Sequence, residues 1–137
     1  MVQQSAANPA IVSLYNALNV SGLTSLASVW NNVPQSTTYP YVLISLGSET
    51  RMDAMGRPGK SVLCEVHVFS QARGDKEALT ILSKVVELLH YQALSVSAHG
   101  LVAVQYEQGF DAGTELVNTI PTRHHIGLFR VTVTQVP

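Results

Sequence analysis

Hydrophobic residues along the chain follow first a helical and then a strand period. Over residues 11–18 they recur at positions i, i+3, i+4 and i+7, and Asn8-Pro9 just before them is a favourable helix start. Residues 41–46 then form an apolar run, and residues 62–69 alternate between two faces. This pattern predicts one helix followed by two strands.

The second half repeats this order. Asp75 is a plausible N-cap for an amphipathic helix that reaches Leu89. Residues 101–106 read as a third strand and residues 125–136 as a fourth, separated by a predicted loop from Gly109 to Pro121. We therefore expect a single α/β (α+β) domain over residues 1–137. Its small mixed or antiparallel four-stranded sheet would be flanked by helices in the order helix-strand-strand-helix-strand-strand.

Composition narrows the class of protein. The 137 residues suffice for one domain, and no apolar run approaches the roughly 18 residues that a membrane span needs. Residues 1–5 lack the basic and apolar regions of a signal peptide, so we expect no such leader. A net charge of −1 gives no general attraction to nucleic acid or lipid, and the single cysteine, Cys64, excludes an internal disulfide.

Charge is distributed unevenly. No Asp, Glu, Lys or Arg precedes Glu49. Such a segment indicates surface that becomes covered, with Trp30, Tyr39 and Tyr41 as candidate anchors of a contact between subunits. The alternative is that its many Gln, Asn, Ser and Thr side chains provide the solvation.

Between the first two strands the sequence predicts an extended loop at about 47–60, longer than a hairpin requires. It holds the first charges of the chain, and we expect it to contact a partner or a neighbouring subunit. Its candidate contact residues are Glu49, Arg51, Met52, Asp53, Met55, Arg57 and Lys60.

Catalytic and metal-binding patterns are weak. Gly59-Lys60-Ser61 resembles the end of a phosphate-binding loop, but a strand follows it and Ala54 stands where that motif needs glycine. His124 and His125 would point to opposite faces of a strand, and no zinc or calcium motif occurs. Cys64 reads as an inert core residue. We predict no catalytic residue, no cofactor and no metal.

The chain resembles the tail terminator (tail completion) proteins of long-tailed phages and related particles, including gene transfer agents. The resemblance rests on Val33-Pro34, on residues 39–42, on residues 66–70 before a Gly-Asp helix, and on the closing strand with residues 130–133. It implies a structural virion protein, not an enzyme, that forms a homohexameric ring on the tail tube. The ring would stop tube polymerisation and provide the head-tail joining surface.

The implied partners are the tail tube protein and a head-neck adaptor or connector, with no membrane. The implied location is the tail-neck region of the virion, reached from the host cytoplasm during assembly. Double-stranded DNA would pass through without specific binding, so a lumen poor in Lys and Arg is expected. Glu107, Asp111 and Glu115 are candidate lumen-facing acids, or else ordinary solvated ones. Two other classes stay open: a small-ligand-binding or regulatory α+β domain, and a compact hydrolase.

Overall fold

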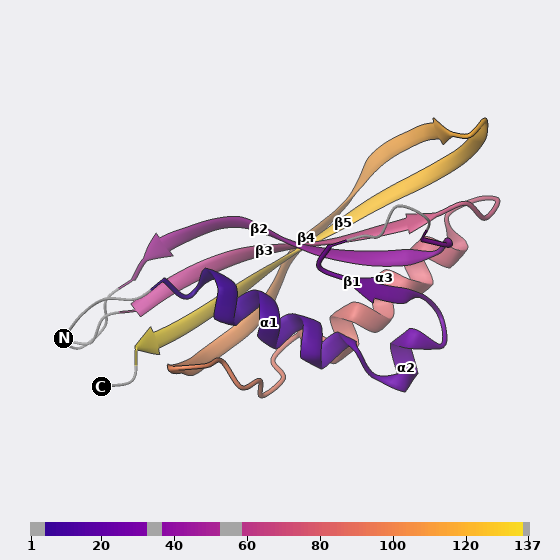
Figure 1. Cartoon of the computed structure of the whole chain (residues 1–137). Coiled ribbons are helices and arrows are strands. Elements are labelled where there is room, and N and C mark those ends of the chain that lie inside the picture. The colour runs from indigo at the N-terminus through magenta and orange to yellow at the C-terminus, as the bar shows by residue number, and fades with distance from the viewer. Residues whose placement is uncertain (1–4, 33–36, 53–58, 136–137) are drawn as a thin grey trace.

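The computed structural model describes residues 5–32, 37–52 and 59–135, which combine helices with one curved sheet (Figure 1). The elements in chain order are α1 (Ala7–Leu18), α2 (Ser21–Thr24), β1 (Ser28–Trp30), β2 (Tyr41–Arg51), β3 (Gly59–Ser70), α3 (Lys76–Leu89), β4 (His99–Val117) and β5 (Ile120–Gln135). The α+β class and the mixed sheet are confirmed. The short strand β1 is an addition to the four predicted strands.

The sheet has the strand order β1-β2-β3-β5-β4. β1 runs parallel to β2, and every other pair is antiparallel. The chain thus builds two long hairpins, β2–β3 and β4–β5, which meet where β3 pairs with β5. Among the described helices, none is long and apolar enough to span a membrane.

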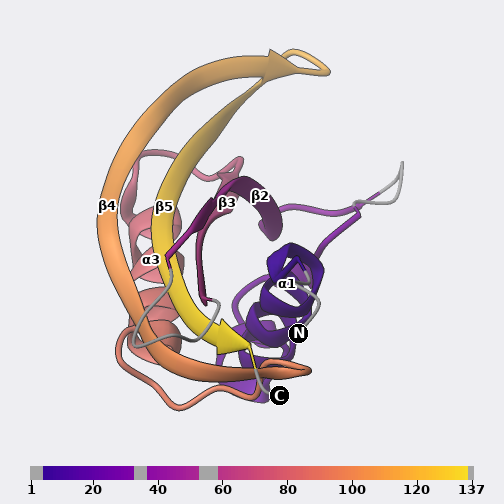
Figure 2. The ribbon, with the colours of Figure 1, turned by 90° about the vertical axis from the view of Figure 1, so that its left-hand side faces the viewer.

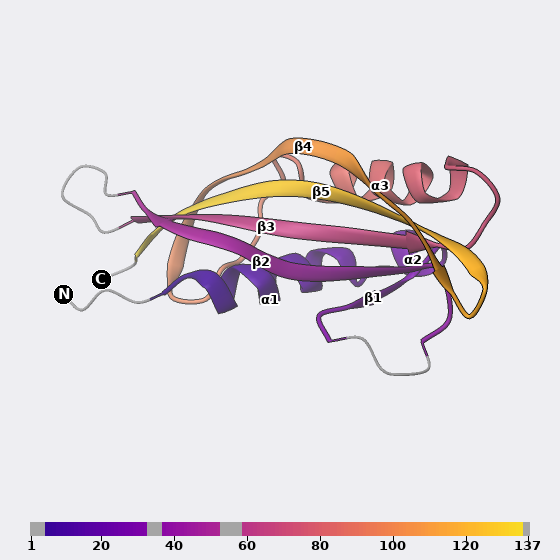
Figure 3. The same ribbon diagram turned by 90° about the horizontal axis from the view of Figure 1, so that it is seen from above.

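The core lies between the two longer helices and one face of the sheet. Figure 3 shows α1 beside β2 and α3 beside β4 and β5. Both helices contribute fully buried side chains, such as Leu14 and Leu89, to the core. The inward residues of the central strands are buried, among them Val62, Cys64, Val66, Val68, Phe129, Val131 and Val133.

The strands β2 and β3 extend further than the sequence predicted. Residues 47–51 belong to β2 and residues 59–60 to β3, so most of the described part of the predicted loop is paired strand. Gly47 lies at a register shift between Leu46 and Ser48, where a bulge accommodates it. Residues 53–58 lie outside the described part of the chain.

The prediction of a loop from Gly109 to Pro121 is wrong. β4 continues to Val117 and β5 begins at Ile120, so this segment forms the turn end of a long, curved hairpin (Figure 2). Register shifts in β4 absorb its irregular positions, and Gly113 adopts a φ of +108° that favours glycine. The turn residues Asn118 and Thr119 both have positive φ, as a tight two-residue hairpin turn requires.

The helix starts also differ in detail from the expectation. α1 begins at Ala7 rather than after an Asn8 cap, and its N-cap, Ala6, has no capping side chain. Instead the Glu49 carboxylate of β2 accepts hydrogen bonds from the Ala6 amide and the Ser5 hydroxyl. A carboxylate at this end of a helix also favours the helix dipole. Asp75 is the N-cap of α3, but its side chain does not cap the helix.

Candidate interaction surface

Alternate residues of the central strands point away from the helices and form what we call the open face of the sheet. Its members are half-buried rather than exposed, and most are apolar or aromatic: Tyr41 and Leu43 from β2, Leu63, His67 and Phe69 from β3, and His124, Ile126 and Leu128 from β5. An uncovered sheet face of this composition is suited to a protein contact.

Aromatic side chains line up across one end of the open face. The ring centroids of Tyr39 and Tyr41 lie 5.1 Å apart, those of Tyr41 and Phe69 4.8 Å, and those of Phe69 and His124 4.2 Å. His67 stacks beside His124 at 4.9 Å. We call these five residues the aromatic row. Strand register creates it, because Tyr41 pairs with Phe69 and Phe69 pairs with His124.

The two histidines of the row share a hydrogen bond. His67 Nδ1 and His124 Nε2 are 2.7 Å apart, and His67 Nε2 lies 3.0 Å from a Glu65 carboxylate oxygen. The network fits one tautomer: His67 donates from Nε2 to Glu65, and its Nδ1 accepts a hydrogen bond from the N–H at His124 Nε2.

Burial lowers the pKa of His124 below its ordinary value of 6.5, and the neighbouring His67 lowers it further. His125 also lowers the pKa of His124, whereas the carboxylates of Glu115 and Asp111 raise it. The folded state therefore favours neutral His124. The surroundings of the aromatic row thus stabilise the uncharged imidazole of His124.

Stability should accordingly fall on acidification. Below about pH 6.5 the unfolded chain binds a proton at His124 that the folded chain resists, so the free energy of unfolding decreases as pH falls toward the folded-state pKa. In His124→Phe, which keeps an aromatic ring against Phe69, this part of the pH dependence should disappear. Urea unfolding of both proteins between pH 7.5 and 5 measures it. Parallel curves for the two proteins would contradict the assignment.

Tyr41 is held as a neutral phenol. Burial raises its pKa to about 12, with further contributions from the adjacent Tyr39 and from the Glu115 carboxylate. Glu115 can raise the pKa of Tyr41 because the β4–β5 hairpin curls toward this end of the open face (Figure 2). The row therefore presents uncharged aromatic surface with hydroxyl groups.

Of the three aromatic anchors predicted from the sequence, two belong to this row. Tyr39 and Tyr41 contact each other, whereas Trp30 lines a separate surface pocket with Val12 and Tyr15 of α1. The Trp30 indole N–H donates to the Ser28 hydroxyl at 2.9 Å. The role of Trp30, Tyr39 and Tyr41 in contacts between subunits stays a prediction. The other members of the row, Phe69, His67 and His124, join it through strand pairing. The sequence alone did not indicate them as interface residues.

The candidate contact residues of the predicted loop divide into three groups. Glu49 is engaged with the start of α1, as described above. Met52 is exposed and its amide donates to the Gly59 carbonyl, while Arg51 and Lys60 are paired across β2 and β3. The others, Asp53, Met55 and Arg57, lie outside the described residues. The contact role of this segment stays a prediction.

The three candidate lumen acids lie in β4 but have different surroundings. Glu107 forms an ion pair with Arg130, which neutralises its charge. Asp111 accepts a hydrogen bond from the Gly113 amide, and Glu115 is exposed beyond it. A lumen-facing role for these residues stays a prediction, and it rests chiefly on Asp111 and Glu115.

One polar cluster was missed in the sequence because its members are far apart in the chain. An Asp75 carboxylate oxygen lies 3.2 Å from Arg123 Nη1 and 3.3 Å from His125 Nε2. Asp111 is close enough that Asp75, Asp111 and His125 offer ligand atoms within 4.8 Å of one another. These residue types could hold a divalent cation, but the guanidinium already provides a counter-charge. We infer that these contacts hold the start of α3 against the β4–β5 hairpin.

Cys64 offers no nucleophilic chemistry. It is fully buried, and burial raises the pKa of its thiol to about 12, so the thiolate is scarce at neutral pH.

Comparison with known proteins adds a family and a fold. The model of the family described as "Tail completion protein gp17" matches residues 2–125. Among solved structures, a chain of the "Virion of native gene transfer agent (GTA) particle" is similar with a TM-score of 0.71 and 22% sequence identity. The match covers 93% of this chain and 95% of that one, and it establishes the likeness of fold. A search of curated proteins found no match.

Proposed function

This chain belongs to the Tail completion protein gp17 family, and on that premise we propose that it forms a homohexameric ring on the end of a tail tube. As a member of this family it is a structural virion component and not an enzyme. The proposed ring stops polymerisation of the tube and provides the surface to which the head is joined. The family match over residues 2–125 carries this proposal.

The surface chemistry of the chain supports an assembly role. The open face exposes a half-buried band of apolar and aromatic side chains that no helix of the described chain covers. The β4–β5 hairpin adds exposed apolar residues at its far end, including Leu116 and Ile120. These surfaces differ from one another, as the two sides of a head-to-tail contact do, and such contacts close into rings when the rotation per subunit is right.

The proposed partners are the tube protein on one side of the ring and a head-neck adaptor on the other. Assembly would take place in the host cytoplasm before the particle is complete. Genomic DNA would pass through the ring without specific binding, since the chain has a net charge of only −1 and no Lys or Arg between residues 85 and 122.

The alternative classes fit this molecule less well. A ligand-binding domain should show an enclosed apolar pocket with converging polar groups. The pockets among the described residues are instead surface depressions, such as the one bordered by Trp30 and Val12. For a hydrolase, the cluster around Asp75 is already engaged by Arg123, and it holds the hairpin in place.

Deleting the gene for this chain from its particle tests the proposal. Tubes should then grow to variable and excessive lengths and should fail to join heads, and both defects should be cured by supplying the chain in trans. Electron microscopy measures tube length and head attachment. Tubes of normal length with heads attached in the deletion would overturn the proposed function.

A further inference from the structure

We propose that the outer edge of β4, residues 109–116, pairs as an antiparallel strand with the outer edge of β2, residues 44–51, of a second copy of this chain. The sheets of neighbouring subunits then join into one continuous sheet. This inference rests on the proposed ring and deepens it, because it names the two segments and their register at one contact between subunits.

The outer edge of β4 is only partly used within one subunit. In the strand order β1-β2-β3-β5-β4, β4 is an outermost strand, and Figure 2 shows it on the outside of the curved hairpin. Residues of an antiparallel strand direct their backbone groups alternately to its two sides. At Val104 and Tyr106 the outward groups are engaged, because the Val104 carbonyl accepts from the Tyr91 amide and the Tyr106 amide donates to His90 Nδ1.

Beyond Tyr106 the outward backbone groups have no partner in the described part of the chain. Continuing the alternation past the two bulges gives four outward residues: Gly109, Asp111, Thr114 and Leu116. Pro121 agrees with this assignment, because it lies opposite Leu116 and a proline has no amide hydrogen to give to the ladder. An edge with free donors and acceptors is a template for a further strand.

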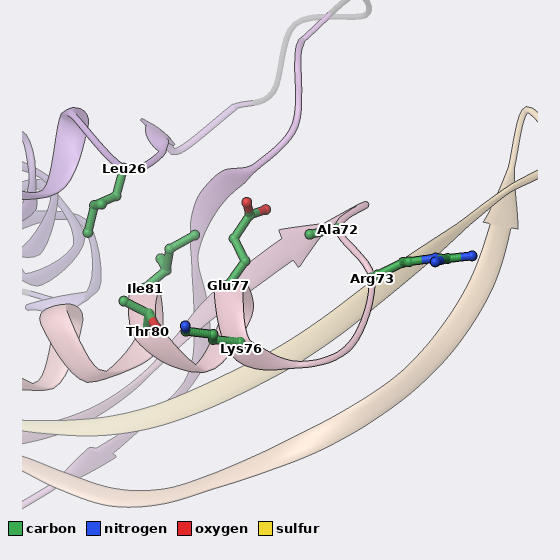
Figure 4. Close-up of a pocket in the computed structure, with 7 residues that line it drawn as sticks. All are labelled: Leu26, Ala72, Arg73, Lys76, Glu77, Thr80 and Ile81. Atoms are coloured by element: carbon green, nitrogen blue, oxygen red, sulfur yellow. The ribbon is translucent and has the colours of Figure 1, made fainter.

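The start of α3 does not cover this edge. Figure 4 shows the side chains there, and Arg73 is the labelled residue that extends furthest toward the hairpin. Within the described residues Arg73 forms no hydrogen bond with β4. The neighbouring Asp75 contacts Arg123 and His125, which belong to β5. The outer edge of β4 therefore stays accessible to another chain.

The opposite edge of the sheet is also open over part of its length. β1 pairs with β2 only from Tyr41 to Leu43, so the rest of β2 has no neighbouring strand on that side among the described strands. By the same alternation, the outward residues of this part are Ile44, Leu46, Glu49 and Arg51. A head-to-tail ring brings two different surfaces of the subunit together, and a sheet with two different open edges provides them.

Strand direction is compatible with this pairing. The four strands β2, β3, β5 and β4 are successively antiparallel, so β4 runs opposite to β2. A rotation that repeats the subunit around a ring therefore places β4 of one copy antiparallel to β2 of the next. Antiparallel pairing is slightly more stable per residue than parallel pairing.

Bulges on both edges specify the register. Outward residues recur every second position, but a bulge lengthens one interval to three: from Asp111 to Thr114 in β4 and from Leu46 to Glu49 in β2. The two long intervals coincide when Thr114 lies opposite Leu46 and Asp111 opposite Glu49. The preceding long interval of β4 begins at Tyr106, whose amide is already bonded to His90. The match therefore selects residues 109–116.

The side chains suit this register. Leu116 is 72% exposed and Leu46 is 44% exposed, and the register makes them diagonal neighbours across the contact. The two acids that lie opposite each other are engaged within their own subunits: Glu49 accepts from the Ala6 amide and Asp111 from the Gly113 amide. A third strand also supports the end of the hairpin, since two-stranded ribbons are only marginally stable in water.

Disulfide formation in this register tests the contact. In preparations shown by native mass spectrometry to contain the ring, Leu46→Cys/Thr114→Cys should give a ladder of disulfide-linked multimers on mild oxidation. The Cα atoms of directly opposite residues lie about 5.5 Å apart, a separation that a disulfide spans. Thr50→Cys/Thr114→Cys is the matched control, because Thr50 is exposed on the same strand but lies roughly 13 Å further along it. Cys64 is fully buried and should not react.

Amide hydrogen exchange distinguishes strand pairing from mere proximity. The outward amides of Leu46 and Thr114 should exchange rapidly in the dissociated subunit and roughly tenfold or more slowly in the ring, because pairing gives them acceptors. Ile126, whose amide is directed to β4 inside the sheet, should be protected in both states. Mass spectrometry with residue-resolved fragmentation measures these rates.

A ring without the Leu46–Thr114 ladder, or with an equal ladder in the Thr50 control, would overturn this contact while leaving the proposed function intact. Unchanged exchange of the two outward amides on assembly would overturn it as well. Absence of any ring, also in assembled particles, would overturn both the contact and the proposed function.

Discussion

Replacing Phe129 with alanine should lower the free energy of unfolding by about 3–5 kcal/mol, the range typical of large-to-small changes in a core. Phe129 is fully buried between Cys64 of β3 and Tyr106 of β4, and its ring centroid lies 5.3 Å from that of Tyr106. The loss is a large share of the roughly 5–15 kcal/mol that stabilises a typical domain. Urea unfolding followed by circular dichroism measures it.

Phe110→Ala is the matched control for this prediction. Phe110 belongs to the same hairpin but is 40% exposed, so its truncation in the isolated subunit should cost much less than that of Phe129. Similar losses for the two variants would mean that the core does not lie between the helices and this face of the sheet.

Replacing Tyr41 with alanine should raise the protein concentration at half-assembly of the ring about 30-fold. The estimate takes ~2 kcal/mol for truncating an aromatic anchor at the centre of an interface. Tyr41 connects Tyr39 to Phe69 in the aromatic row, so its removal interrupts the stack. Mass photometry across a concentration series measures the shift.

Tyr91→Ala provides the comparison, because Tyr91 is 65% exposed and lies after α3, outside the row. Its truncation should shift the assembly midpoint by less than about threefold. If Tyr41→Ala assembles as readily as the unaltered protein, the open face is not a subunit contact.

The sequence predicted elements best where one period persisted over many residues. The alternation from Val62 to Phe69 and the helical stripe before Leu89 specify the central strand and α3, because each buries a continuous face. β1 escaped prediction because three residues are too few to display a period. It forms only because β2 offers it an edge.

The β4–β5 hairpin was misread for a physical reason. Gly109, Gly113 and Pro121 normally mark loops, and the turn is Asn118-Thr119 rather than the usual Asn-Gly. Cross-strand pairing with β5 overrides these local preferences, and bulges absorb the mismatches in register.

The aromatic row shows the same division between local and long-range information. Tyr39 and Tyr41 could be selected from the sequence, because they lie in an uncharged segment. Their contact with Phe69 and His124 depends on the register of three strands, which a single sequence does not specify.

Native mass spectrometry, over a range of concentrations and on rings released from particles, measures the mass of the assembled chain and so tests the proposed hexameric ring. We expect a species of about six times the 14.8 kDa subunit mass, whose share of the protein grows with concentration. A monomer at every concentration and in assembled particles would contradict it.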